Sequence, residues 1–269
     1  MIHLLAPRLR VEERLLMQAF SERGYEAALL DASALSLSLT GEQGELPGVV
    51  LDRDVATGER AVLGALLAVG AAVVVNRTAT TRLLADRLAL VRHLVIAGVP
   101  APETVVAFGE GPAVEAARML GSPLRIMAPV VTPSLPDAVA GDADATEAII
   151  EHRATLAHET LVLLQRVPAG ATWRVAVVGD DAVAATAETG DGPAPSGEIP
   201  TEVGAVVDRV VSRLGTGVYA VEVVEAAGGP VVTGASNLVE FRALQQAGHD
   251  VAGRIADFTI AQIDGGVSS

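Results

Sequence analysis

The sequence of 269 residues contains no cysteine and no lysine. The absence of cysteine excludes disulfide bonds, thiolate chemistry and cysteine-based metal sites. All 19 basic residues are arginines, so a Schiff base, a lysine general base and a lysine on a nucleotide phosphate are excluded as well. Any phosphate clamp in this chain must therefore use arginine side chains or backbone N–H groups.

Long hydrophobic runs and an excess of positive charge are also missing. No apolar run reaches the roughly 18 residues that cross a bilayer, and the N-terminal MIHLLAPRLR indicates a short strand followed by arginines, not a signal peptide. The net charge of -14 opposes binding to nucleic acid or to an anionic membrane. We therefore expect a cytoplasmic protein with neither of these partners.

The sequence is rich in apolar residues, at 50% of the chain, which is ample for a folded core. In the N-terminal third, short apolar runs alternate with helical patterns, and this order predicts a parallel α/β sheet. The expected strands are Ile2–Ala6, Ala27–Leu30, Val49–Leu51 and Ala72–Val75, and the expected helices are Val11–Arg23 and Glu59–Val69. No glycine-rich dinucleotide fingerprint follows the first strand, which disfavours an NAD domain.

Polar side chains directly follow two of these expected strands. Arg53 comes after one strand and Asn76 after another. Ligands of open α/β sheets gather at the carboxyl ends of the strands, so both residues are candidate substrate contacts. The alternative is that Asn76 and the neighbouring Asp54 are turn and helix-capping residues.

The middle of the chain begins with one long helical pattern from about Thr80 to Ala97. A strand at Thr104–Ala107, a helix at Pro112–Leu120 and a strand at Pro123–Met127 are expected after it. The order of NR, this helix, AGVPAPET and GSPLRIMAP resembles the start of an ATP-grasp domain. More narrowly, it resembles RimK-like ligases of the LysX type, which attach an amino acid to an acidic carrier protein in lysine or arginine biosynthesis.

This resemblance implies a fold of the α/β (α+β) class with ATP-grasp architecture. The expected domains are an N-terminal parallel α/β domain at 1–78, a central lobe at 79–163 and a C-terminal lobe at 164–269, with a nucleotide cleft between the lobes. ATP and Mg²⁺ are the cofactors that the resemblance implies.

The nucleotide-binding residues of such ligases are altered in this chain. The strand that ends in a phosphate-binding lysine in the family ends here in Met127 and Ala128, and the glycine-serine loop becomes PVVTPSLPDAVAGDADA. Arg87 occupies the lysine position of an aspartate-lysine pair. Arg125 lies two residues before the lost lysine, on the same face of the strand. Both are candidate phosphate contacts, although Arg125 also suits a solvated strand residue.

The segment TLVLLQRVPAGATWRV resembles the hinge and following strand of the family. Gln165 is the candidate nucleotide contact here, and Arg166 follows it where active relatives have a glutamate. Arg174 is the retained charge of an aspartate-hydrophobic-arginine motif and the candidate catalytic residue. The next segment, GDGPAPSGEIP, is expected to be a loop, and it lacks the arginine-glycine-glycine motif of active relatives.

The stretch GVYAVEVVEAAGGPVVTGASNLVEFRAL resembles the hairpin that carries the metal ligands of the family. The three ligand positions align with Glu222, Gly234 and Ser236, so Glu222 is the one remaining candidate metal ligand. Asn237 and Glu240 lie next to these positions and are candidate substrate contacts.

Several catalytic and Mg²⁺-binding positions are replaced together, and this pattern leads to our first hypothesis. The chain is then a degenerate ATP-grasp protein that serves as a non-catalytic or regulatory partner of an active paralogue. A second hypothesis is an active carboxylate–amine ligase that joins an amino acid to an acidic carrier protein. A third is an amino-acid sensor that uses the cleft without nucleotide. The resemblance also implies a dimer or tetramer.

Overall fold

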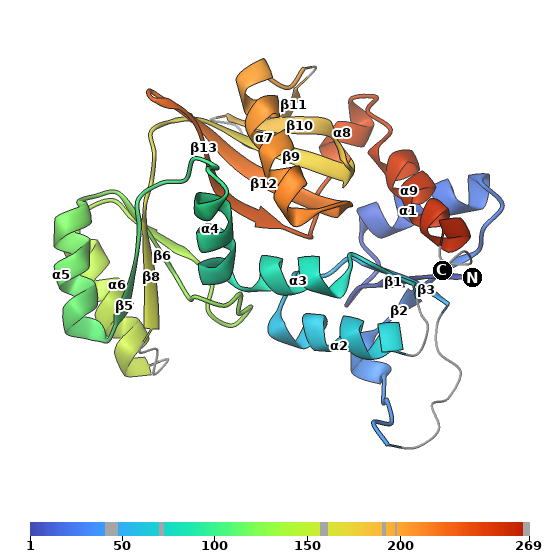
Figure 1. Cartoon of the computed structure of the whole chain (residues 1–269), viewed down its shortest axis with the longest axis horizontal. Coiled ribbons are helices and arrows are strands. Elements are labelled where there is room, and N and C mark those ends of the chain that lie inside the picture. The colour runs from blue at the N-terminus through green and yellow to red at the C-terminus, as the bar shows by residue number, and fades with distance from the viewer. Residues whose placement is uncertain (41–47, 70–72, 157–160, 190–191, 197, 266–269) are drawn as a thin grey trace.

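The structure is a computed structural model and describes residues 1–40, 48–69, 73–156, 161–189, 192–196 and 198–265. Three sheets organise it (Figure 1): one parallel sheet and two antiparallel sheets. The central lobe, drawn mainly in green, stands apart on one side of the view, and the N- and C-terminal elements lie together on the other side. The mixed α/β class is confirmed.

The N-terminal sheet is parallel, as the alternating pattern predicts. Its strands are β1 (Ile2–Leu5), β2 (Ala27–Leu30), β3 (Val49–Asp52) and β4 (Val73–Val75). Their order in the sheet is β2-β1-β3-β4. The connecting elements are α1 (Val11–Glu22), the 3₁₀ helix η1 (Ala32–Ala34) and α2 (Gly58–Val69). Short apolar strands joined by helices form such a sheet because both of its faces can then be covered.

In the structure, the name central lobe is used for residues 104–166, which form an antiparallel sheet in the order β5-β8-β6-β7 and two helices. Its strands are β5 (Thr104–Phe108), β6 (Leu124–Met127), β7 (Ala138–Ala140) and β8 (Leu161–Arg166). Its helices are α5 (Glu110–Leu120) and α6 (Ala143–Leu156). The buried apolar side chains of these elements, such as Ala113, Ile126 and Leu164, form a cluster of their own. The central lobe therefore has a separate hydrophobic core.

The C-terminal sheet is antiparallel in the order β11-β10-β9-β12-β13. Its strands are β9 (Gly170–Gly179), β10 (Asp181–Thr189), β11 (Gly192–Ser196), β12 (Gly217–Ala226) and β13 (Gly229–Ser236). Its helices are α7 (Thr201–Leu214), α8 (Arg242–Gln246) and α9 (Val251–Gly265). Helix α7 lies on one face of the sheet, where its buried valines and Leu214 join the side chains of Val177 and Val221.

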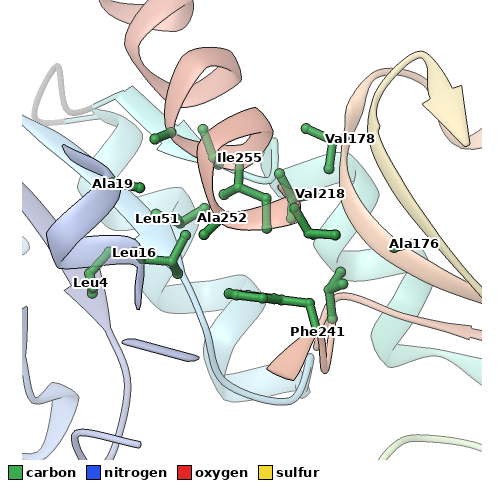
Figure 2. Packing of buried hydrophobic residues seen from close by; sticks show 14 of the residues in the cluster. Leu4, Leu16, Ala19, Leu51, Ala176, Val178, Val218, Phe241, Ala252 and Ile255 are labelled. Atoms are coloured by element: carbon green, nitrogen blue, oxygen red, sulfur yellow. The ribbon is translucent and has the colours of Figure 1, made fainter. Parts of the chain in front are cut away.

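The N-terminal and C-terminal parts share one core. Figure 2 shows Leu16 of α1, Leu51 of β3, Val218 of β12 and Ile255 of α9 in the same apolar cluster. Residues far apart in the sequence therefore meet here, and these two parts of the chain pack as one unit.

The expected single helix from about Thr80 to Ala97 is wrong, because the chain forms two helices there. These are α3 (Thr78–Ala85) and α4 (Arg87–Ile96). Asp86 lies between them in an extended conformation and caps α4, with its side chain accepting a hydrogen bond from the backbone N–H of Ala89 at 2.8 Å. The backbone on either side of Asp86 pairs with residues 129–131, and this pairing interrupts the helical hydrogen bonds. Both helices pack into the core of the C-terminal sheet.

The expected loop GDGPAPSGEIP also differs from the structure in part. Its residues 192–196 form β11, which pairs with β10 in antiparallel register; residues 190, 191 and 197 lie outside the described residues. Because β11 is the edge strand of the sheet, Pro193 and Pro195 are tolerated there despite the missing N–H groups. The described part of the chain contains no helix long and apolar enough to cross a membrane.

Candidate active-site cleft

Four neighbouring strands of the C-terminal sheet place one row of residues side by side. Glu222 of β12 pairs with Arg174 of β9 on one side and with Gly234 of β13 on the other. Arg174 in turn pairs with Thr186 of β10. Directly paired residues project from the same face of a sheet. The row Thr186–Arg174–Glu222–Gly234 therefore crosses one face of the sheet as a continuous strip.

A cavity of about 620 Å³ lies over this strip. Its wall combines the C-terminal sheet with Arg125 and Gln165 of the central lobe, Glu12 of α1 and Arg242 of α8. A smaller cavity of about 170 Å³ adjoins it and shares Arg125, Gln165 and Glu222 with it. A volume of several hundred cubic ångströms suits a small-molecule ligand. The strip thus forms the floor of a cleft between two lobes.

A chain of ion pairs crosses this cleft. A carboxylate oxygen of Glu222 accepts a hydrogen bond from Arg174 at 2.7 Å, and its other oxygen lies 3.4 Å from Arg125. Arg174 also donates to Glu240 at 2.9 Å. Since Arg125 belongs to the central lobe and Glu222 to the C-terminal sheet, one of these pairs joins the two walls of the cleft.

These contacts keep Glu222 ionised. Burial by itself would raise the pKa of the Glu222 carboxyl, but the charges of Arg174 and Arg125 and their hydrogen bonds lower the pKa below its ordinary value. Glu222 is therefore a carboxylate whose negative charge is balanced by protein cations.

The residues present at this point do not fit a magnesium ion. Mg²⁺ needs several hard oxygen ligands in octahedral geometry, but a side chain is missing at Gly234, where an ideal Cβ atom would lie 3.6 Å from the nearer Glu222 oxygen. The hydroxyl of Ser236 accepts a hydrogen bond from the N–H of Leu238. Across the residues that the structure describes, no group of three or more His, Cys, Asp or Glu side chains is placed to hold a metal ion.

Arg53 was expected to contact substrate, but the structure buries it away from both cavities. The side chain is 0% exposed, lies 3.5 Å from the Glu13 carboxylate and donates to the carbonyl of Val239 at 2.9 Å. Its guanidinium carbon lies 5.4 Å from the ring centre of Phe241. Arg53 thus joins the N-terminal sheet to residues 239–241, which carry Glu240 into the cleft.

Asn76 and Asn237 are likewise buried and bind backbone. The Asn237 amide accepts from the N–H of Ala56 at 2.6 Å and donates to the carbonyl of Asp54 at 2.7 Å. Asn76 holds the N–H and the carbonyl of Val218 at 2.5 and 2.8 Å. Both side chains therefore connect the N-terminal part to the C-terminal sheet, and neither lines either cavity.

The expected phosphate and nucleotide contacts Arg87 and Gln165 do line the cleft. Arg87 borders the smaller cavity, where it donates to the carbonyl of Ala128 at 2.9 Å and pairs with Asp137 at 2.7 Å. Gln165 is 2% exposed, borders both cavities and donates to the hydroxyl of Thr104 at 3.2 Å. With Arg125, Arg174, Glu222 and Glu240, the structure brings six of the nine expected residues to one cleft.

Sequence reasoning missed three charged residues of the wall, Glu12, Glu188 and Arg242. Glu188 lies near the end of β10. Glu12 lies in the first turn of α1, and Arg242 begins α8. Neither has a local motif that marks it. Glu12 reaches the cleft because α1 packs with α9 in the shared core, and that packing has no signature in the sequence around Glu12.

The three sheets and the cleft between two of them define an ATP-grasp protein. A family model of the LysX pre-ATP-grasp domain matches residues 2–83. The crystal structure of a RimK-domain ATP-grasp protein from Sphaerobacter thermophilus DSM 20745 is similar, with a TM-score of 0.89 and 48% sequence identity, over 96% of this chain and 98% of that chain. The chain therefore belongs to the RimK-like family of ATP-grasp ligases.

More distant solved structures share the fold. The ATP-grasp ligase PsnB, solved with a phosphomimetic variant of its minimal precursor, Mg and ADP, has a TM-score of 0.74 at 19% identity, over 97% of this chain and 98% of that chain. The D-alanine–D-alanine ligase from Bacillus anthracis, solved with ATP, has a TM-score of 0.72 at 13% identity, over 97% of this chain and 96% of that chain. At these identities the likeness concerns the fold alone.

Proposed function

We propose that this chain is a non-catalytic ATP-grasp protein. It keeps the fold of its family and binds a ligand or a partner, but it does not catalyse ligation on its own. One observation carries the proposal: Glu222, the remaining acid at the metal position, is held by Arg174 and Arg125 with a glycine opposite it. Forming an acyl phosphate brings two anions together, and in ligases of this kind bound Mg²⁺ relieves their repulsion. In the part of the chain that the structure describes, no group of three or more His, Cys, Asp or Glu side chains is placed to hold that ion.

The segment after β6 supports the same proposal. Strand β6 ends in Met127, which is buried, and the chain has no lysine to reach a phosphate. Arg153 of α6 donates hydrogen bonds to the carbonyls of Ile126 and Pro136 at 3.2 and 2.6 Å. These bonds restrain the proline-rich segment that follows β6. Proline also removes backbone N–H groups that a phosphate would need. This segment is therefore poorly suited to close over a nucleotide.

The partner that we propose is an active paralogue, to which this chain contributes regulation, within a cytoplasmic dimer or tetramer. The alternative partner is an acidic carrier protein. The net charge of -14 disfavours that carrier, because proteins with strong charges of the same sign repel each other. A small amino acid is the proposed ligand, since both acidic and basic side chains line the larger cavity.

The test is ADP release by the purified chain in Mg-ATP, with 2-aminoadipate or glutamate as substrate and an acidic carrier protein as acceptor. We expect no release above a control without protein. Turnover that disappears in Glu222→Ala would contradict the proposal and support an active ligase in which Arg125, Arg174, Glu222 and Glu240 replace the missing groups. That second candidate rests on the presence of all four residues in the wall of the larger cavity.

The third candidate function is an amino-acid sensor that binds no nucleotide. A thermal-shift screen distinguishes it from the other two candidates. Stabilisation by an amino acid with none by ATP would favour the sensor. The same screen repeated with the active paralogue present shows whether the amino acid changes the association of the two proteins.

A further inference from the structure

The two walls of the cleft belong to separately cored parts of the molecule. The apolar cluster of the central lobe is formed by residues of that lobe alone, whereas the C-terminal sheet shares its core with the N-terminal part. Arg125 extends from β6 of the central lobe toward Glu222 on β12. What occupies Arg125 therefore bears directly on what the cleft can hold.

The Arg125 side chain is held only weakly by its neighbours in the structure. Its side chain is 28% exposed, and its distance to the nearer Glu222 oxygen is 3.4 Å, which is long for a charge-assisted hydrogen bond. Among the residues that the structure describes, Glu222 is the one hydrogen-bond or ion-pair partner of the Arg125 side chain. A guanidinium group has five N–H donors in a planar fork that matches a carboxylate or phosphate. Arg125 lines both cavities, so its guanidinium group borders the cleft.

Glu222 does not depend on Arg125 for its charge balance. The contact from Arg174 to Glu222 is 2.7 Å, and both residues lie side by side on adjacent strands. An incoming anion can therefore replace Glu222 on Arg125 while Glu222 stays paired with Arg174. Gly234 leaves the space beside Glu222 open, and both cavities border Arg125.

We propose that the cleft binds an anionic group, a carboxylate or a phosphate, directly on Arg125 and without a divalent cation, with Glu222 as the counter-anion that the ligand displaces. This inference rests on the proposed function, because it names the ligand chemistry of the same non-catalytic cleft. It differs from metal-bridged nucleotide binding in one respect that can be measured. Neutralising Glu222 strengthens binding if Glu222 competes with the ligand, and weakens binding if Glu222 holds a metal ion.

The experiment is calorimetric titration of the full-length chain with tripolyphosphate and, separately, with glutarate, each in EDTA and in excess Mg²⁺. We expect binding of at least one of the two anions in EDTA. Excess Mg²⁺ should change glutarate binding by less than about twofold, and it should weaken tripolyphosphate binding, because Mg²⁺ chelates that anion in solution. The two probes distinguish a phosphate site from a carboxylate site. Binding that requires Mg²⁺, or no binding of either anion, overturns the inference.

Three variants locate the site. Arg125→Ala should weaken binding by about tenfold or more, because a charge-assisted hydrogen bond is lost, whereas Glu222→Gln should strengthen it. Arg118→Ala is the matched control, since Arg118 is an exposed arginine of the same lobe that pairs with Glu147, and it should leave the affinity unchanged. Circular dichroism confirms that each variant is folded.

Two results would contradict the assignment to Arg125 and Glu222. One is an unchanged affinity in Arg125→Ala, and the other is weaker binding in Glu222→Gln. The ADP-release assay is independent of these titrations. Turnover would count against the proposed function, whereas loss of anion binding without turnover would count against this inference alone.

Discussion

Glu222 shows how the neighbours of a carboxylate decide its chemistry. Its position on β12, facing a wide cleft, would suit a metal ligand, yet guanidinium groups approach it from the neighbouring strand and from the opposite lobe. A divalent cation placed here would lie close to two positive charges, and in a half-buried site that repulsion is only weakly screened. The carboxylate and the two arginines thus form an ion network across the cleft.

Arg53 is the residue whose loss we expect to destabilise the fold most clearly. Arg53→Ala removes the buried partner of Glu13, which is itself 0% exposed, although Arg10 still pairs with Glu13 at 2.9 Å. Removing one member of a buried ion pair typically costs about 3–5 kcal/mol. Urea unfolding should show a loss in this range, and the exposed control Arg118→Ala should change the stability by less than about 0.5 kcal/mol. A loss for Arg53→Ala no larger than that of its control would contradict the structural role of Arg53.

Asp52 should make stability depend on pH near neutrality. Burial raises the pKa of this carboxyl from 3.8 to about 7. Between these two values the folded protein holds a proton that the unfolded chain has released, so stability falls as the pH rises from about 4 to about 7. Asp52→Asn removes this dependence and should stabilise the protein at pH 8 by on the order of 1–4 kcal/mol.

Thermal unfolding of both proteins from pH 4 to pH 8 measures this effect. Asn keeps the oxygen that accepts the N–H of Asp54 at 3.0 Å, so the comparison isolates the charge. Parallel pH curves for the two proteins would show that Asp52 does not titrate in this window.

At the scale of elements, local patterns predicted most strands and helices. The parallel order of the N-terminal third follows from its alternating apolar runs and helical patterns, and the hairpin β12–β13 was expected from the family resemblance. The break at Asp86 was missed because the apolar pattern continues through it, and the pairing that interrupts the helix comes from residues 129–131. Strand β11 was not predicted because prolines usually argue against a strand, although an edge strand tolerates them.

Residues of the cleft were predictable where they lie on strands whose neighbouring strands can also be recognised in the sequence. Arg174 and Glu222 were expected at the site, and their direct pairing on β9 and β12 brings them together. Arg53 and Asn237 lie outside the linings of both cavities for the opposite reason. Their polar side chains satisfy backbone groups and charges on other elements, and the sequence does not show which distant groups need a partner.

Asp86 provides the test at this scale. Asp86→Ala removes the side-chain cap of α4, and loss of such a cap costs about 0.5–2 kcal/mol. Asp144→Ala is the control, because Asp144 is an exposed acid in the first turn of α6. Chemical denaturation should show a clear loss for Asp86→Ala and a smaller one for Asp144→Ala. Equal changes would mean that the cap does not hold the break between α3 and α4.

At the scale of the whole molecule, the separate hydrophobic cores imply that a destabilising substitution in one core loosens mainly the sheet around that core. Ile126 is 0% exposed in the core of the central lobe, and Val177 is 0% exposed in a core of the C-terminal sheet. Truncating a buried Ile to Ala costs about 2–5 kcal/mol. Ile126→Ala should therefore speed amide hydrogen exchange in β5–β8 and leave β9 and β12 protected, and Val177→Ala should do the reverse. Faster exchange across all three sheets in both variants would show that the chain unfolds as one unit.

We propose that Glu222 serves as an arginine-bound anion and does not coordinate a metal. Titration of the full-length chain with Mn²⁺, followed by electron paramagnetic resonance with and without ATP, tests it most directly, with Glu222→Gln as the comparison. We expect the same Mn²⁺ binding curve for both proteins, because any Mn²⁺ would bind to acidic groups elsewhere on the surface. A bound Mn²⁺ ion present in the original chain and lost in Glu222→Gln would contradict it.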